Sequence, residues 1–237
     1  MRMAAPVALF LTLLVTFAGV ARADSIASEL PIGSTYEDFV RVSRTRVPLP
    51  AGKWVVTALK EARNHNNNVT ADVTLANFVN GRLMAYVAIR TNLDPERNGW
   101  VPSDFCPGKN AYFTQTDAAY QRQQACWGIN HTIMNATSSF EPTYGKSIRQ
   151  TLADRNLTMP RVMISAKFRA ANEAFFLNYE ILLNPEYFGF SAAGETSWAN
   201  SPWHKDLVAR DGRRQQFLEQ VKAQYSAFLP VLAGQFR

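Results

Sequence analysis

Residues and motifs that commonly carry chemistry are scarce in this sequence. The chain of 237 residues has only two cysteines and three histidines. It contains no P-loop, no G-x-G-x-x-G, no H-E-x-x-H and no EF-hand loop, so the familiar signatures of nucleotide, zinc-protease and calcium sites are absent. Residues 189–194 come closest to a G-x-S-x-G nucleophile elbow, but they are one residue too long and do not lie between a parallel strand and a helix. The sequence therefore predicts no cofactor.

The three histidines, His65, His131 and His204, are too dispersed to indicate a metal site. They are expected in a turn, on a strand and on a short helix, without the spacing that zinc ligands use. We predict no metal. His131 shares a strand face with Trp127 and Ile129, which favours a buried histidine bonded to the backbone over a catalytic one.

The small number of cysteines points to a single disulfide. Cys106 and Cys126 form an even pair, and in an oxidising compartment a bond between them is the default expectation. Such a bond would stabilise the fold by about 3 kcal/mol through loop closure. A catalytic thiol is the alternative, and the even count argues against it.

After the first residues, no segment approaches the roughly 20 apolar residues of a transmembrane helix. Residues 1–23 have the charged start, the apolar run and the Ala-Arg-Ala end of a cleaved signal peptide. We therefore expect an exported chain whose mature part, residues 24–237, is one soluble domain in the periplasm or outside the cell. With no linker, repeat or low-complexity tract, a second domain is not predicted.

Charge of one sign is not concentrated in this sequence. Two of the 25 basic residues fall in the leader, so against 19 acidic residues the mature chain has a small positive excess. The basic residues are spread along the chain, apart from Arg41, Arg44 and Arg46, which indicates a solvated surface and no nucleic-acid partner. A small ligand or a component of the cell envelope is the partner that remains.

Residues 68–92 predict the β-hairpin around which the rest of the sheet is organised. Apolar residues alternate with others on both arms and meet at Asn80 and Gly81. A two-residue loop would put the two apolar sets, including Leu83 and Ala85, on opposite faces. We therefore favour a three-residue loop that starts at Val79, with Gly81 in a left-handed bulge position.

Further alternating runs predict more strands, and a four-residue loop joins a second hairpin in which Phe168 opposes Phe175. The remaining predicted strands are residues 36–46, 52–63, 111–116 and 124–134.

Three helices are expected between or after the strands. Residues 142–155 have apolar residues at helical spacing. A short helix should run from Pro202 to Ala209, and Asp211 should cap the last helix, which Pro230 should end or kink near Ala227.

Together these elements predict an α+β fold. We expect an antiparallel meander sheet of about six or seven strands, with the two longer helices packed on one face. A closed antiparallel barrel with a C-terminal helix is the alternative.

The segment at residues 184–209 is irregular and aromatic. It places Trp198, Trp203 and His204 close together in sequence, and exposed rings with a polar neighbour are typical of ligand sites. The alternative is a purely structural role, in which these rings cap an open end of the core. We predict that any ligand surface includes these three residues.

A chain without a catalytic constellation is a poor enzyme candidate. We therefore expect a non-enzymatic binding or envelope-associated role. The alternative is a hydrolase whose groups converge only in space, with His131, His204, Glu195 and Asp206 as the candidates.

Overall fold

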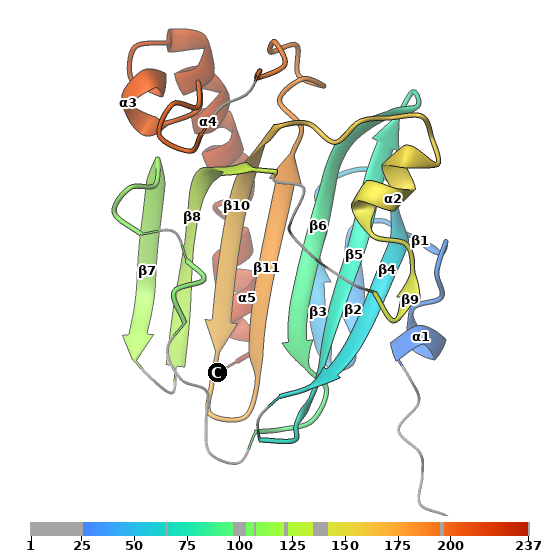
Figure 1. Ribbon diagram of the computed structural model, residues 1–237. Coiled ribbons are helices and arrows are strands. Elements are labelled where there is room, and N and C mark those ends of the chain that lie inside the picture. Colours follow the sequence, from blue (N-terminus) through green and yellow to red (C-terminus); the bar gives the residue numbers. More distant parts are fainter. Residues whose placement is uncertain are drawn as a thin grey trace, which may run out of the picture.

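The computed structural model describes residues 26–64, 66–96, 103–106, 108–120, 123–134, 142–194 and 197–236. The signal peptide predicted at residues 1–23 lies outside this part. A nine-stranded sheet in which every strand pair is antiparallel dominates the fold, and a separate two-stranded ribbon lies behind it (Figure 1). The fold is mostly antiparallel sheet with few helices, as the sequence predicted.

The large sheet is open. Its strands follow the spatial order β1-β4-β5-β6-β11-β10-β8-β7, with β9 paired to β4. In chain order these are β1 (Thr35–Tyr36), β4 (Trp54–Arg63), β5 (Val69–Val79), β6 (Arg82–Asn92), β7 (Phe113–Tyr120), β8 (Gln123–Ile133), β9 (Tyr144–Gly145), β10 (Val162–Ala171) and β11 (Phe176–Leu183). The two end strands of this order, β1 and β7, do not pair with each other, so the sheet does not close. The closed barrel considered as an alternative is therefore wrong. The prediction of six or seven strands missed the two-residue strands β1 and β9, which are too short to show a period.

The helices lie on both faces of the sheet. They are α1 (Ile26–Glu29), α2 (Ile148–Ala153), α3 (Lys205–Val208), α4 (Gly212–Tyr225) and α5 (Phe228–Gly234). In Figure 1, α5 lies behind the sheet and α2 in front of it. Leu152 of α2 packs on Met163 and Leu182, in a cluster separate from the main core. The prediction that both longer helices pack on one face was therefore wrong, because the apolar stripe of residues 142–155 does not say which face it covers.

The main core lies between the sheet and α4 and α5. Its centre is a group of aromatic rings around Phe168. The centre of the Phe168 ring lies 5.2 Å from that of Trp127, on which it stacks, 5.8 Å from that of Tyr179 and 5.9 Å from that of Phe228 of α5. Asp211 caps α4 by accepting from the backbone N–H of Arg214, as predicted. These contacts position β8, β10 and β11 from one side, while α2 covers part of their other face.

The central hairpin turns through two residues rather than the predicted three. Val79 pairs with Arg82, and Asn80 and Gly81 have φ angles of 51° and 74°, the left-handed pair of a type I′ turn. A two-residue turn alone would put the apolar residues of the two strands on opposite faces. A β-bulge, in which Met84 is the extra residue, prevents this. Beyond the bulge, odd-numbered residues of β5 pair with odd-numbered residues of β6, so the apolar residues of both strands share one face.

This bulge also moves Leu83 to the opposite face from Ala85. Leu83 joins the smaller cluster with Leu182, whereas Ala85 stays in the main core. Asn184, just after β11, holds the bulge from the neighbouring strand: its backbone N–H donates to Met84 O and its Nδ2 to Leu83 O, both at 2.9 Å. The hairpin register therefore depends on a residue about 100 positions away.

Replacing Asn184 by alanine should lower the free energy of unfolding by about 1–3 kcal/mol, because Asn184 is buried and the change leaves the Leu83 carbonyl without its donor. Chemical denaturation measures the loss. The exposed residue Asn200 is the matched control, and Asn200→Ala should change stability by less than about 0.5 kcal/mol. Equal stabilities for the two variants would contradict this role of Asn184.

Two other predicted strand features needed correction. The strand predicted at residues 36–46 is broken by Asp38 and Ser43, whose φ angles are 59° and 54°, and its middle folds into the ribbon of β2 (Phe39–Val42) and β3 (Thr45–Pro48). In the second hairpin the loop is residues 172–175, so Phe168 opposes Tyr179 instead of Phe175. The apolar residues still share one face, because the loop keeps four residues.

The C-terminal helices follow the predicted breaks with small shifts. The short helix begins at Lys205 and takes His204 as its N-cap, whereas Pro202 was predicted to open it. The last predicted helix is divided: α4 ends at Tyr225, and Pro230 falls in the first turn of α5, where its missing N–H costs little.

Candidate functional site

The face of the sheet opposite α4 and α5 holds a cavity of about 680 Å³. Its floor comes from β5, β6, β8, β10 and β11, and its walls from the start of α2 and from Phe105. Residues of even number on β5 and β6 point into it, since their odd neighbours face the main core. The cavity is therefore assembled from segments that are far apart in the sequence.

One end of the floor is a polar row on three strands, and Arg169 extends this row onto a fourth strand outside the cavity lining. The register aligns Asp72, Arg90, Asn178 and Arg169 as direct neighbours. Arg90 forms a two-pronged ion pair with Asp72, with Nε–Oδ1 at 2.5 Å and Nη2–Oδ2 at 3.0 Å. Arg169 Nη1 donates to Asn178 Oδ1 at 2.6 Å. This end of the cavity is thus built from charged and amide groups that are already ordered.

The next row carries a second pair of opposite charges. Ala88 lies directly beside Glu180, which in turn opposes Lys167. Lys167 Nζ is 3.7 Å from Glu180 Oε1, and the same oxygen accepts the hydroxyl of Ser165 at 2.5 Å. Lys167 Nζ also lies 5.2 Å from the centre of the Phe105 ring. The small side chain of Ala88 leaves space above the floor beside this pair.

The opposite end of the floor is apolar. Tyr86 and Leu182 pair across the two central strands, and together with Met163 they pack beneath Leu152 of α2. The Tyr86 hydroxyl reaches Met134 Sδ at 3.9 Å. Burial, with the nearby charge of Glu180 as a second cause, raises the pKa of the Tyr86 phenol, so the group is neutral. The cavity consequently changes from polar to apolar along its length.

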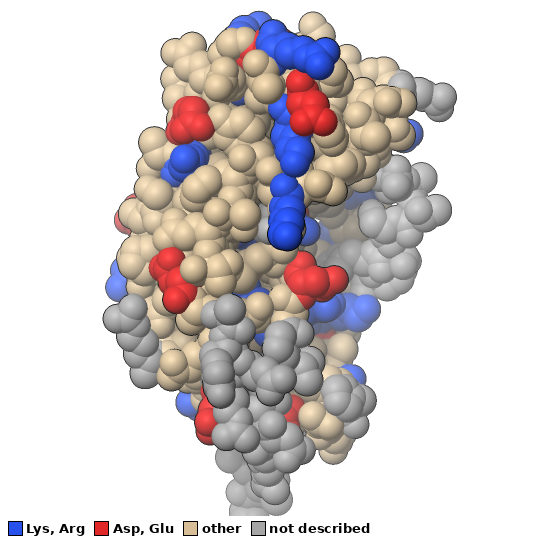
Figure 2. Space-filling view, turned by 90° about the vertical axis from the view of Figure 1, so that its left-hand side faces the viewer, with Lys and Arg blue, Asp and Glu red and all other residues tan. Residues whose placement is uncertain are grey.

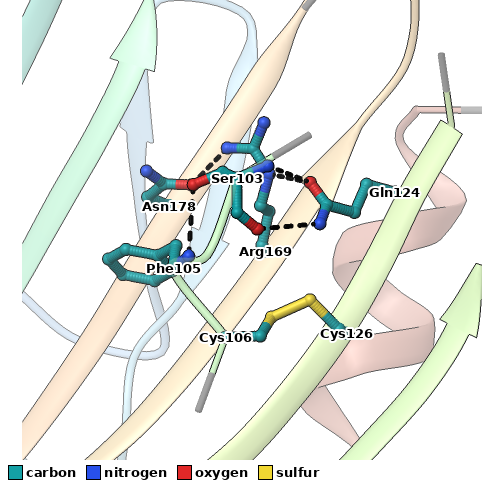
Figure 3. Close-up of a disulfide and its surroundings, with 7 residues drawn as sticks. All are labelled: Ser103, Phe105, Cys106, Gln124, Cys126, Arg169 and Asn178. Carbon is teal, nitrogen blue, oxygen red and sulfur yellow. Dashed lines mark hydrogen bonds between the residues drawn. A yellow bond between two sulfur atoms is a disulfide. The ribbon is translucent and has the colours of Figure 1, made fainter. Parts of the chain in front are cut away.

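The disulfide ties the wall at Phe105 to the sheet. Cys106 and Cys126 are bonded, with Cα atoms 6.1 Å apart, as the sequence predicted. Figure 3 shows the surrounding polar contacts, in which Gln124 joins the loop at Ser103 to Arg169. The Gln124 amide donates to Ser103 O at 3.0 Å, and its oxygen accepts from Arg169 Nε.

Arg169 is the most buried of the charged groups around this cavity. Only 4% of it is exposed. Burial lowers the pKa of the guanidinium to about 10, which leaves it charged at neutral pH. A fixed positive charge therefore lies behind the Phe105 wall.

The three residues that the sequence proposed as a ligand surface lie elsewhere, and none of them lines this cavity. Two of them come together, since the centre of the Trp198 ring lies 4.7 Å from that of His204, and Trp203 directly precedes His204 in the chain. Trp203 is 3% exposed and packs on Phe190 and Phe217 of the main core, at 4.8 and 5.7 Å. Trp198 is half-buried. A ligand role for this group stays a prediction.

The candidate catalytic histidines are close to each other, with ring centres 6.2 Å apart. His131 is buried, and its Nε2 lies 3.0 Å from the backbone oxygen of Trp198, to which it donates. His204 Nδ1 lies 3.6 Å from a carboxylate oxygen of Asp206 and accepts from the backbone N–H of the same residue. Glu195 lies outside the described residues. His131 therefore has the backbone bond expected of a buried histidine.

Stability should depend on the protonation of His131. Burial lowers the pKa of the imidazole below its ordinary value of 6.5. The unfolded chain therefore takes up this proton before the folded one, and stability should fall as the pH drops through about 6.5. Urea unfolding at about pH 8 and pH 5.5 measures the effect. The variant His131→Gln should lose less stability over this interval, and an unchanged pH dependence in it would contradict the assignment.

The surface beside β7 shows how the net positive charge is distributed. Figure 2 shows a row of basic side chains there, with acidic side chains on both sides of it. The positive excess is thus mixed with acidic groups on this side of the molecule.

Comparison with models of protein families, with curated proteins and with solved structures finds no match to this chain. Among the helices of the described ranges, none has the length and apolar character needed to cross a membrane. Over the same residues, no three His, Cys, Asp or Glu side chains are grouped so that they could hold a metal ion.

The cavity residues were missed at the sequence level because charged residues on strands indicate a solvated face. A signal was present in hindsight. Lys167 and Glu180 lie on the polar faces of the two arms of the second predicted hairpin, and the predicted four-residue loop puts these opposite charges on the same side of the sheet.

Proposed function

We propose that this protein is an exported, non-enzymatic binding protein, periplasmic or secreted, which holds a small molecule in the cavity opposite α4 and α5. The observation that carries the proposal is the cavity of about 680 Å³ with a polar and an apolar end. Ligand sites typically have volumes of about 300–1,000 Å³ and combine apolar walls with a few fixed polar groups. The leader and the disulfide support export.

The chemistry on the floor favours binding over catalysis. Ser165 is 0% exposed and its hydroxyl is bonded to Glu180, so a substrate cannot reach it as a nucleophile. Glu180 is held by Ser165 and Lys167. The hydrolase alternative is supported less, because His131 donates Nε2–H to a carbonyl and is buried. Polar groups that are already bonded to one another suit recognition.

Filling the cavity from its floor tests the proposal. Ala88 lies between Thr74 and Glu180, so the ring of Ala88→Trp should occupy the space above the floor. Nile red, an uncharged fluorescent apolar probe, should bind the wild type saturably, and the variant should bind it at least about tenfold more weakly. Fluorescence titration measures both affinities.

Thr114 on β7 provides the matched control, since it is exposed on a strand and does not line the cavity. Thr114→Trp should bind Nile red like the wild type. Equal affinities in Ala88→Trp and the wild type, or no saturable binding by the wild type, would overturn the proposal.

A further inference from the structure

The polarity of the cavity floor changes in the same direction on its two central strands. Along β6 the residues that face the cavity run from Arg90 through Ala88 to Tyr86. Along the neighbouring strand β11 they run from Asn178 through Glu180 to Leu182, and each is paired with its counterpart. A molecule lying along these strands would have its polar part at the Arg90 end and its apolar part under α2.

The distance between the two ends suits a single chain. Leu182 comes four positions after Asn178, which corresponds to about 14 Å at the rise of an antiparallel strand. The apolar end continues to Ile148 of α2 and to Met159, which also line the cavity. This geometry fits a head group joined to a tail of medium length.

The basic side chains of the polar end and of the next row differ in how many of their hydrogen-bond donors are engaged. Arg90 is engaged by both carboxylate oxygens of Asp72. Lys167 Nζ is 3.7 Å from Glu180, beyond hydrogen-bond distance, and within the described part of the chain it makes no closer polar contact. Its side chain is 30% exposed and faces the cavity beside Phe105. An ammonium group with unused donors can bind an anion.

The balance of charge also favours an anionic head. The cavity lining includes three basic residues, Arg90, Arg149 and Lys167, against two acidic ones, Asp72 and Glu180. Glu180 already accepts the Ser165 hydroxyl, so a cationic head would compete with Ser165 and Lys167 for that carboxylate. An anion at Lys167 would share the ammonium with Glu180, but Glu180 is 3.7 Å away and leaves the hydrogen-bond donors of the ammonium unused.

We propose that the cavity binds single-chain amphiphiles with an anionic head, of which a medium-chain carboxylate is the simplest member. The head contacts Lys167 beside the Phe105 wall, and the tail lies over Leu182 and Tyr86 toward α2. This inference rests on the proposed function, since it requires the cavity to be a binding site, and it adds the class of ligand and the residue that selects it.

Three ligands with the same tail and different heads test the inference. Decanoate, decanol and decyltrimethylammonium are titrated calorimetrically, below the concentrations at which they form micelles, into the mature chain with its disulfide intact. Decanoate should bind most tightly. The variant Lys167→Met keeps the length of the side chain and removes its charge, so it should weaken decanoate about tenfold and leave decanol within about twofold.

Two variants serve as controls in the same titrations. Lys53→Met removes an exposed lysine that does not line the cavity and should bind all three ligands like the wild type. Ala88→Trp should weaken all three. The ranking of the three ligands on the wild type needs no variant, so it decides the inference even if Lys167→Met folds poorly.

Each other outcome overturns the choice of head group. Equal affinities for the three ligands, tightest binding of decyltrimethylammonium, or decanoate binding that Lys167→Met leaves unchanged would show that Lys167 does not select an anion. If none of the three ligands binds, the proposed class of ligand is wrong. The proposed function fails separately, if Nile red does not bind saturably or if Ala88→Trp does not weaken its binding.

Discussion

Replacing Trp203 by alanine should lower the free energy of unfolding by about 3–5 kcal/mol, the range measured for removing a buried aromatic side chain. Trp203 is only 3% exposed, and its ring lies 4.8 Å from that of Phe190 and 5.7 Å from that of Phe217. Its removal would leave a void between the irregular segment and α4. Urea denaturation of the purified variant measures the loss.

Trp198 is the matched control for Trp203, because it belongs to the same aromatic group but is only half-buried. Its ring stacks on His131 at 5.0 Å, so Trp198→Ala should cost about 1 kcal/mol. The comparison also tests the ligand surface predicted at Trp198, Trp203 and His204. If Trp203→Ala remained as stable as the wild type and lost a ligand, the aromatic group would be a binding surface and its core role would be wrong.

Removing the disulfide should have the second-largest effect. The bond joins residues that are 20 positions apart, and the double variant Cys106→Ala, Cys126→Ala should lose about 3 kcal/mol of unfolding free energy in the chain-entropy model. Denaturation under non-reducing conditions gives the difference. Reduced wild type should unfold at the same denaturant concentration as the double variant.

The same double variant should also bind Nile red more weakly, because Phe105 is next to Cys106 and forms a wall of the cavity. The titration is done in the absence of denaturant, where the variant remains folded by its main core. A double variant with wild-type stability would contradict the first expectation. Unchanged Nile red affinity would show that the polar contacts of Gln124 hold the wall without the disulfide.

Local features of this fold were predicted well where they depend on neighbours in sequence. The alternation of apolar residues located the long strands, since a period of two needs no knowledge of partners. The cap at Asp211 and the break before Pro230 were also correct, because both depend on the chemistry of one or two residues. Single residues with left-handed backbone angles, Asp38 and Ser43, were missed and broke a predicted strand.

The hairpin at Asn80 and Gly81 shows where local reasoning reaches its limit. The dipeptide favours a two-residue turn, and the alternation of apolar residues argues against it. The protein satisfies both by inserting Met84 as a bulge, which Asn184 holds from the next strand. The sequence around the turn carries no sign of that distant support.

By itself the sequence determined which side of each strand is apolar, where the last helix begins and breaks, and which two cysteines could pair. Only the tertiary structure decided that α2 and α4 cover opposite faces, and that Glu180 and Lys167 lie on a cavity floor next to Ala88. The reason is physical: a period along one strand reports the burial of its own side chains. The neighbours of a side chain across a sheet depend on pairings such as β6 with β11, which join residues about 90 positions apart and leave no local pattern.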